Sequence, residues 1–305
     1  MIDHFDGAAL EAPLVSVILP VYNGALFLDE SIKSILSQSS ENLELLIIYD
    51  ISSDKSLEII ERYRSIDKRV KLVLGDNAAL IGALNKGIEL AKGKFIARMD
   101  ADDVSMHNRF KEQIELLESK QADICGSHFL VINESGSAID AKIVPLHKDE
   151  FVACLAAGVP FPHGSVMIRL DFLKKHRLSY GLVECSEDYK LWVMLFEAGA
   201  VFANVDKFIF KCRKTSSSLS QRLKKCTARD AKSISNGFVL NNYNEYANSV
   251  NCLLNNYENI SFELRKFLLI GALRASISKQ TLIFFRVLFN SSGTAVLLFL
   301  CALLR

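Results

Sequence analysis

Several signatures that assign a protein to a class are missing from this sequence. Its charges nearly cancel, with 36 Lys and Arg against 35 Asp and Glu, so the net charge does not favour nucleic acid as a partner. The seven cysteines form no Cys-x-x-Cys pair and have no histidines at zinc-finger spacing, which favours a reducing compartment. Residues 1–11 carry Asp3, Asp6 and Glu11 and no basic apolar run, unlike a secretory signal. We therefore expect a cytoplasmic protein with no nucleic-acid partner.

Two nucleotide-binding motifs are also missing. No Gly-x-Gly-x-x-Gly follows the first apolar run and no Gly-x-x-x-x-Gly-Lys-Ser/Thr occurs, which argues against a dinucleotide-dependent oxidoreductase and a P-loop NTPase. What the sequence does have is an uneven charge distribution. Residues 207–305 carry 15 Lys and Arg against 4 Asp and Glu, whereas residues 1–206 carry 21 against 31. This asymmetry predicts two parts with different surroundings.

Strand-like and helix-like segments alternate from residue 15 to about residue 120. Short apolar runs predict buried strands, and apolar residues at helical spacing, such as Leu28, Ile32 and Ile35, predict the helices between them. The alternation predicts an α/β protein whose mostly parallel sheet is flanked by helices. The predicted strands are residues 15–20, 43–49, 70–74 and 95–99. Because such sheets bind ligands beyond the carboxyl ends of their strands, the first candidates for a site are residues 20–24, 50–54 and 100–103.

The fourth predicted strand runs into three carboxylates, Asp100, Asp102 and Asp103. Clustered like charges repel, so this arrangement costs stability unless a cation or hydrogen-bond donors compensate. Carboxylate oxygens suit Mg²⁺ or Mn²⁺, and these ions in turn bind phosphate oxygens. The alternative is a solvated acidic turn in which Asp103 caps the next helix.

Four segments in order carry a resemblance to a known family. They are residues 15–24 (VSVILPVYNG), 85–103 (NKGIELAKGKFIARMDADD), 162–168 (PHGSVMI) and 186–192 (SEDYKLW). Together they resemble the inverting family-2 nucleotide-sugar glycosyltransferases of the GT-A fold, of the bacterial surface-polysaccharide type. The resemblance implies an N-terminal extension (1–13), a GT-A domain (14–220) with a nucleotide-binding half (14–120) and an acceptor half (121–220), and a basic helical extension with an apolar C-terminus (221–305).

The resemblance also implies a metal and donor site. It places Mn²⁺ or Mg²⁺ on Asp102 and Asp100, and it places donor contacts at Pro20, Tyr22, Asp50, Asp100, His163 and Arg213. Asp50 matches the family's base-contacting acid, whose carboxylate accepts a hydrogen bond from a uracil-like ring N–H, so UDP is the default nucleotide. The sequence departs from the family pattern here, with Tyr49-Asp50-Ile51-Ser52 in place of Asp-Asp-Gly-Ser, and Thr215 stands where the family has a histidine.

Glu187 and Asp188 resemble the family's catalytic pair. The resemblance makes Asp188 the general base that takes the proton from the acceptor hydroxyl, and a base opposite the leaving group requires inversion. Glu187 would orient the acceptor or brace the loop. The alternative is an ordinary acidic first turn of a helix. His163 is expected either near the diphosphate or acceptor or in a structural position, and Arg98 is expected to be a strand-end charge with no role.

These expectations describe a glycosyltransferase with two kinds of partner, a nucleotide diphosphate sugar donor and a glycan or lipid-linked glycan acceptor. A homo-oligomer stays open. Two other interpretations also stay open, a sugar-phosphate nucleotidyltransferase and a non-catalytic member of the family that binds a nucleotide sugar. The first should carry a glycine- and lysine/arginine-rich loop near the first strand, which residues 20–24 lack.

Two apolar runs near the end of the chain, residues 281–289 and 294–304, are each too short to cross a bilayer. Read as one helix they would carry Arg286 into hydrocarbon, which is costly. We therefore expect residues 281–305 to make a peripheral contact at the cytoplasmic face of the membrane, supported by basic residues nearby. The alternative is a helical cap or a dimer contact.

Overall fold

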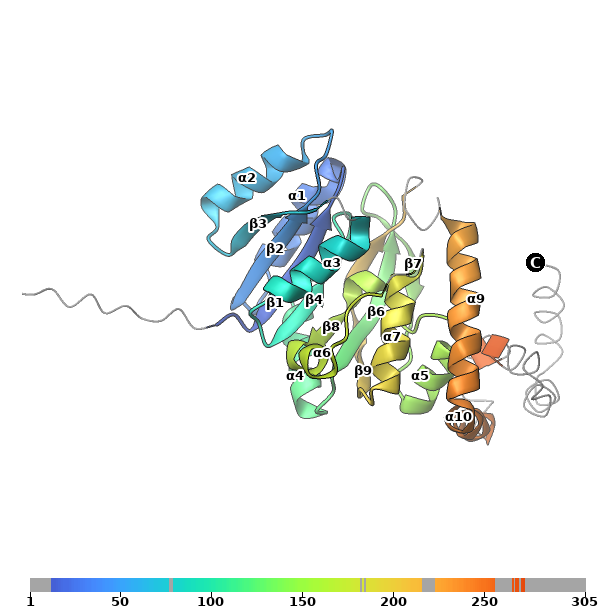
Figure 1. The fold of residues 1–305 in the computed structure, drawn as a ribbon. Helices are drawn as coiled ribbons and strands as arrows, with labels where there is room; N and C mark the ends of the chain where they lie inside the picture. The colour runs from blue at the N-terminus through green and yellow to red at the C-terminus, as the bar shows by residue number, and fades with distance from the viewer. Residues whose placement is uncertain are drawn as a thin grey trace, which may run out of the picture.

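The computed structural model describes residues 12–76, 79–181, 183, 185–215, 223–255, 265, 267–268 and 270–271. In this part of the chain one nine-stranded sheet forms the centre, with the strand order β3-β2-β1-β4-β8-β6-β9-β5 and with β7 paired to β6 (Figure 1). Strands β1 to β4 pair in parallel, as the alternation of elements predicted. The remaining pairs are antiparallel except for β6 with β9.

The four strands predicted between residues 15 and 99 are observed with small shifts at their ends. The strands are β1 (Val15–Val21), β2 (Leu43–Tyr49), β3 (Val70–Leu74), β4 (Phe95–Arg98), β5 (Val104–Ser105), β6 (Ile124–Ile132), β7 (Ala138–Lys142), β8 (Met167–Arg169) and β9 (Phe202–Arg213). The helices are α1 (Ala25–Leu36), α2 (Ser56–Ile66), α3 (Ala79–Leu90), α4 (Arg109–Ser119), α5 (Lys148–Leu155), α6 (Leu170–His176), α7 (Glu187–Glu197), α9 (Lys224–Asn241) and α10 (Tyr243–Asn255).

Two apolar cores cover the two faces of the sheet, because successive side chains of a strand point to opposite faces. In β1, Val17 and Leu19 lie in the core formed with α1, α2 and α4, whereas Ile18 lies in the core formed with α3 and α7. Strands β1 and β2 are buried on both faces and therefore appear in the sequence as nearly continuous apolar runs. This burial fixes the sheet register and with it the edge where the strands end.

The last described helices pack against the body of the protein. Phe238 of α9 and Tyr246 of α10 lie in the same apolar core as Trp192 of α7, and Figure 1 shows α9 standing beside α7. A boundary near residue 220 thus separates two sequence regions that share one core.

Two predicted features lie outside the described residues. These are the N-terminal extension up to residue 11 and the apolar segment 281–305, together with its predicted membrane contact. Among the helices that the structure describes, none has the length and apolar character needed to cross a bilayer.

Candidate active site

The loops that follow β1, β2 and β4 lie side by side at the carboxyl edge of the sheet. The backbone N–H of Asn23 donates to Ser52 Oγ at 3.0 Å. The N–H of Ala25, the first residue of α1, donates to Asp54 Oδ2 at 2.9 Å. Ser31 Oγ of α1 donates to the carbonyl oxygen of Asp100 at 2.9 Å. Because the three strands are parallel neighbours, the predicted candidate segments come together as expected.

Asp100, Asp102 and Asp103 bring three carboxylates to this edge. One oxygen from each lies within 4.8 Å of the others. Asp103 is buried, and burial together with the charge of Asp102 raises its pKa to about 7. Burial also raises the pKa of Asp102. This is the electrostatic cost that the sequence implied, and a divalent cation with a preference for oxygen ligands would relieve it.

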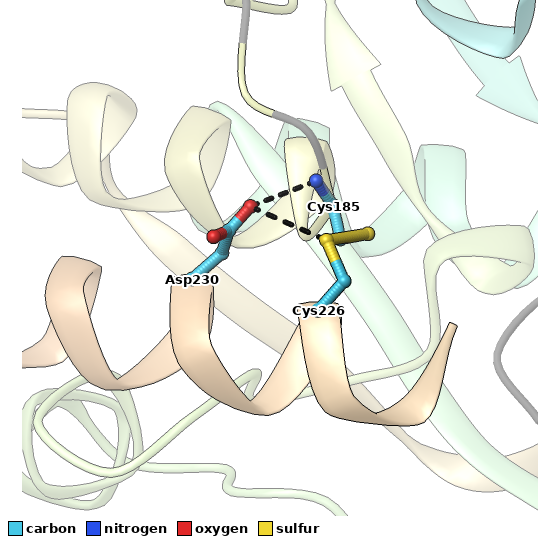
Figure 2. A group of neighbouring side chains, drawn as sticks. All are labelled: Cys185, Cys226 and Asp230. Atoms are coloured by element: carbon cyan, nitrogen blue, oxygen red, sulfur yellow. Dashed lines mark hydrogen bonds between the residues drawn. A yellow bond between two sulfur atoms is a disulfide. The ribbon is translucent and has the colours of Figure 1, made fainter.

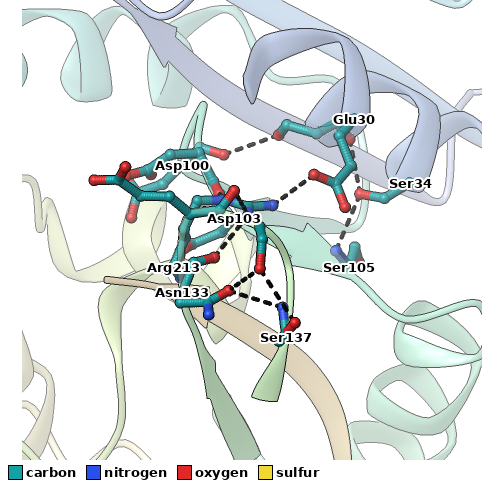
Figure 3. Close-up of polar contacts among 12 residues, drawn as sticks. Glu30, Ser34, Asp100, Asp103, Ser105, Asn133, Ser137 and Arg213 are labelled. Atoms are coloured by element: carbon teal, nitrogen blue, oxygen red, sulfur yellow. Dashed lines mark hydrogen bonds and ion pairs between the residues drawn. The ribbon is translucent and has the colours of Figure 1, made fainter. Parts of the chain in front are cut away.

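Arg213, at the end of β9, donates hydrogen bonds to the segment that carries the acid cluster (Figure 3). Its backbone N–H donates to Asp103 Oδ1 at 2.7 Å, and its Nε donates to the carbonyl oxygen of Asp102 at 2.8 Å. Nη1 donates to the carbonyl oxygen of Asn133 at 3.0 Å, and Nη2 pairs with Glu30 at 2.5 Å. The side chain is 1% exposed and makes these contacts within the protein. Contact between Arg213 and a diphosphate stays a prediction.

Arg98 is a second buried cation that the sequence analysis left without a role. It ends β4, is 5% exposed, and its guanidinium pairs with Asp100. Burial lowers its pKa, and the negative charges of Asp103, Glu187 and Asp188 oppose that effect. The signal was present in the strand pattern. Position 98 falls on the same face as buried Ile96, so its side chain had to point into the protein.

Glu187 and Asp188 form the first turn of α7. Ser186, just before them, adopts a left-handed conformation with φ of 68°, which turns the chain into the helix. Asp188 Oδ1 accepts the backbone N–H of Tyr189 at 2.7 Å. Burial, together with the charge of Glu187, raises the pKa of Asp188 from its ordinary 3.8 to about 6. A partly buried carboxyl group with a pKa near neutrality has the properties of a general base.

His163 connects this pair to a tyrosine that the sequence analysis missed. Its Nε2 lies 2.7 Å from Tyr180 Oη and its Nδ1 lies 3.8 Å from Glu187 Oε1. Burial lowers the pKa of His163 well below 6.5, so the ring is neutral. The backbone of Tyr180 is held by Asn85 of α3, whose amide donates to the Tyr180 carbonyl at 3.0 Å and accepts the Tyr180 N–H at 2.9 Å. No local spacing predicts contacts between residues so far apart in the chain.

Asp50 follows β2 and holds an unused acceptor. Its Oδ1 is buried and has no hydrogen-bond partner among the described residues. Gly75, after β3, makes room for it, because a Cβ at position 75 would overlap that oxygen. Pro20 lies in β1 opposite Ile48 of β2, and Tyr22 is 68% exposed just beyond the strand end. The predicted donor residues of the nucleotide half are thus grouped at one edge.

A disulfide joins the loop before the carboxylate pair to α9 (Figure 2). It links Cys185 and Cys226, whose Cα atoms are 5.9 Å apart, and Asp230 Oδ2 accepts the backbone N–H of Cys185 at 2.8 Å. This bond differs from the expectation of reduced cysteines in the sequence analysis, and the separation of 41 positions gave no signal for the pairing. The bond ties the first residues of α7 to a helix on the far side of the predicted domain boundary.

Comparisons with known proteins agree with the resemblance seen in the motifs. A family profile described as Glycosyl transferase family 2 matches residues 16–176. The chain is similar to the putative glycosyltransferase EpsE of Bacillus subtilis (strain 168), with 36% identity over 216 residues that cover 69% of this chain and 76% of the relative. It is also similar to the putative teichuronic acid biosynthesis glycosyltransferase TuaG of that organism, with 28% identity over 200 residues, or 59% of this chain and 79% of the relative.

Solved structures share the fold at low sequence identity. The crystal structure of S. aureus TarS 1–349 in complex with UDP-GlcNAc matches with a TM-score of 0.56 at 16% identity over 90% of each chain. A longer TarS structure is covered over 54% of its length. The mannosyltransferase PcManGT from Pyrobaculum calidifontis, in complex with GDP-Man and Mn²⁺, matches with a TM-score of 0.52 at 15% identity over 91% of this chain and 86% of the other. The profile covers more than half of the chain, which therefore belongs to glycosyl transferase family 2 and is a glycosyltransferase of the GT-A fold.

Proposed function

We propose that this protein transfers a sugar from a UDP-sugar to a hydroxyl group of a glycan or lipid-linked glycan, with inversion and with Mn²⁺ or Mg²⁺. The observation that carries the proposal is the position of one buried cation between two acidic groups. Arg98 pairs with Asp100 of the acid cluster and lies against Gly164. The residue before Gly164 is His163, whose Nδ1 lies 3.8 Å from Glu187 Oε1. This arrangement supports one site shared by the predicted metal ligands and the predicted base.

The donor nucleotide is proposed to bind at Asp50, Pro20 and Tyr22. The unpartnered Oδ1 of Asp50 is an acceptor at the carboxyl end of β2, and a uracil ring N–H would satisfy it. The ligands in two structural relatives, UDP-GlcNAc in TarS and GDP-Man in PcManGT, support a nucleotide diphosphate sugar as the donor class. Ile51, which is 74% exposed in place of the family's glycine, lies next to Asp50. It leaves the acceptor oxygen buried and available.

The metal is proposed to bind at Asp100 and Asp102. Their oxygens lie close enough to share one ion, and burial raises the pKa of Asp102, so a bound cation would favour its ionised form. A divalent ion bound there would supply positive charge to the departing diphosphate. Asp103 accepts the Arg213 N–H and is placed to hold the loop that carries the other two. The Mn²⁺ in the PcManGT structure supports this choice of ion.

Asp188 is proposed as the general base, with Glu187 and His163 beside it. At neutral pH a carboxyl group with a pKa of about 6 is ionised yet basic enough to accept the proton of an acceptor hydroxyl. Glu187, which raises that pKa, is held near His163 and is placed to orient the acceptor. This intact pair favours a transferase over a non-catalytic family member. The family assignment likewise favours transfer over nucleotidyl chemistry.

The test is to measure binding and slow hydrolysis of a panel of nucleotide sugars by the full chain, with and without Mn²⁺. We expect one UDP-sugar to bind in an Mn²⁺-dependent manner and to be hydrolysed slowly. Asp102→Asn should abolish both without unfolding the protein. Asp76→Asn, which changes an exposed carboxylate, is the matched control and should behave like the wild type. Full activity of Asp102→Asn, or a donor affinity that is the same with and without Mn²⁺, would refute the proposed site.

A further inference from the structure

Arg98 is buried without the partners that a buried guanidinium normally has. It is 5% exposed, and its Nε makes no hydrogen bond to any residue that the structure describes. Apolar side chains, among them Ile18, Ile96 and Val166, line a small cavity against it. Taking a charge out of water is costly unless ion pairs and hydrogen bonds compensate. Stability alone does not explain this residue.

The position of Arg98 is defined closely on the side facing the acid cluster. Gly164 leaves space for the Arg98 guanidinium and the Asp103 carboxylate. A Cβ at position 164 would lie 3.3 Å from Arg98 Nη1 and 2.7 Å from Asp103 Oδ2. The ion pair with Asp100 joins a buried cation to a carboxylate whose side chain is 37% exposed. Asp100 therefore has one side against Arg98 and another open to incoming ions.

We propose that Arg98 is the counter-ion of Asp100 when no ligand is bound, and that it competes with the divalent cation for the Asp100 carboxylate. When the donor binds, Arg98 pairs instead with the negative charge of the donor diphosphate. The proposal rests on the function proposed above. Arg98 and the metal ion both carry positive charge, so they repel each other and seek the same oxygens. When the donor arrives, its phosphates provide new acceptors for the guanidinium, whose planar fork suits phosphate oxygens.

This exchange couples metal binding to donor binding. Without donor, the ion must displace Arg98 from Asp100, and its affinity is reduced. With donor, the displaced guanidinium gains a partner, and ion affinity rises. The coupling is reciprocal, so the ion raises donor affinity by the same factor. The site then binds a free metal ion weakly until the nucleotide sugar is bound.

The test is a titration of the full chain with Mn²⁺, in which electron paramagnetic resonance measures the free ion, first without nucleotide and then with UDP. The titrations are made at pH 8 to keep the carboxyl groups ionised. Arg98→Met should bind Mn²⁺ at least about tenfold more tightly than the wild type when UDP is absent, since it removes both the competitor and the repulsion. UDP should strengthen Mn²⁺ binding by a smaller factor in Arg98→Met than in the wild type.

Three further variants make the test specific. Arg98→Lys keeps the charge and should bind Mn²⁺ as weakly as the wild type when UDP is absent, whereas Arg98→Gln removes the charge and should follow Arg98→Met even if that variant folds poorly. Arg62→Met removes an exposed cation paired with Asp29 and should change nothing. Unchanged or weaker Mn²⁺ binding by both neutral variants would overturn the inference while leaving the proposed function standing. Failure of every variant to bind Mn²⁺, with or without UDP, would overturn both.

Discussion

Asp188 shows how burial gives one residue a chemical property that its type lacks. Its pKa of about 6 means that the folded protein holds a proton on this group up to a higher pH than the unfolded chain does. The folded state therefore loses stability as the pH rises from about 4 to about 6. Above that range the ionised carboxylate is both the proposed base and a cost to the fold.

Asp188→Asn should abolish sugar transfer, keep donor binding and stabilise the protein. The gain in the free energy of unfolding should be about 1–3 kcal/mol above pH 6.5 and should shrink toward pH 4, where the wild-type carboxyl is protonated. Denaturant unfolding at several pH values measures this. In the wild type, kcat/KM should rise as the pH passes through about 6. A variant that is less stable at pH 7 than at pH 4, relative to the wild type, would contradict the buried charge.

Gly75→Ala should weaken nucleotide binding, because the added methyl group would overlap Asp50 Oδ1 and push the carboxylate away from the strand end. We expect UDP affinity to fall by about tenfold or more, measured by calorimetry. Gly237→Ala is the matched control. Its Cβ would meet nothing within 4 Å in α9, so it should leave UDP affinity unchanged and raise helix stability by roughly 0.5–1 kcal/mol. Equal UDP affinity in all three proteins would remove Asp50 from the donor site.

At the residue scale, the acidic residues could be found from the sequence, whereas their partners could not. Asp100, Asp102 and Asp188 stand in short motifs whose spacing is local. Arg98 was set aside because charged residues at strand ends are commonly solvated. Tyr180, unlike Arg98, had no signal in the sequence, since its contact with His163 depends on how two loops pack.

At the scale of elements, Asn85 of α3 holds the loop that carries Tyr180, so a residue of the predicted nucleotide-binding half positions one of the predicted acceptor half. Tyr180 Oη in turn orients His163 toward Glu187. Helix α3, predicted only as a cover for the sheet, thus also supports the neighbourhood of the proposed base. Periodicity reveals which face of a helix is buried, but it does not reveal which polar residue on that helix contacts a distant loop.

Tyr180→Phe should lower kcat by about tenfold and leave the donor KM within about twofold, because it removes one hydrogen bond that orients His163 and leaves the nucleotide contacts in place. Tyr63→Phe is the matched control, since it removes a tyrosine hydroxyl that bonds Asp29 between α1 and α2. It should cost similar stability without changing kcat. Equal kcat in the two variants would reduce Tyr180 to a structural role.

At the scale of the whole molecule, the acidic front and the basic last third do not form separate bodies where the structure describes them. Helices α9 and α10 fill the same apolar core as the sheet, and the Cys185–Cys226 bond adds a covalent link. Two parts with different surroundings, which the charge asymmetry suggested, therefore stay a prediction, because the described residues on both sides of residue 220 pack into one core. We propose that the basic residues of segment 207–305 and the apolar residues 281–305 bring the protein to the cytoplasmic face of a membrane.

Removal of residues 281–305 should release the protein from membranes and leave UDP affinity unchanged, which fractionation and calorimetry measure. Removal of residues 224–305 is the contrasting variant. It would remove buried Phe238 and Tyr246 and expose the apolar core around Trp192 that they help to fill, and should yield unfolded or aggregated protein. Intact protein found entirely in the soluble fraction would contradict the membrane contact. A folded, UDP-binding 1–223 fragment would instead contradict the shared core.

The sequence by itself determined the alternating elements, the parallel orientation of the first strands, and the acidic motifs at their ends. These follow from local periodicity and from the rule that parallel strands end at one edge. Only the tertiary structure decided that Arg98 points into the site, that Tyr180 reaches His163, and that α9 is bonded to the loop before α7. Each of these contacts depends on packing between segments that are distant in the chain. Such packing decides which side chains are buried and which partners they meet, and local sequence does not contain that information.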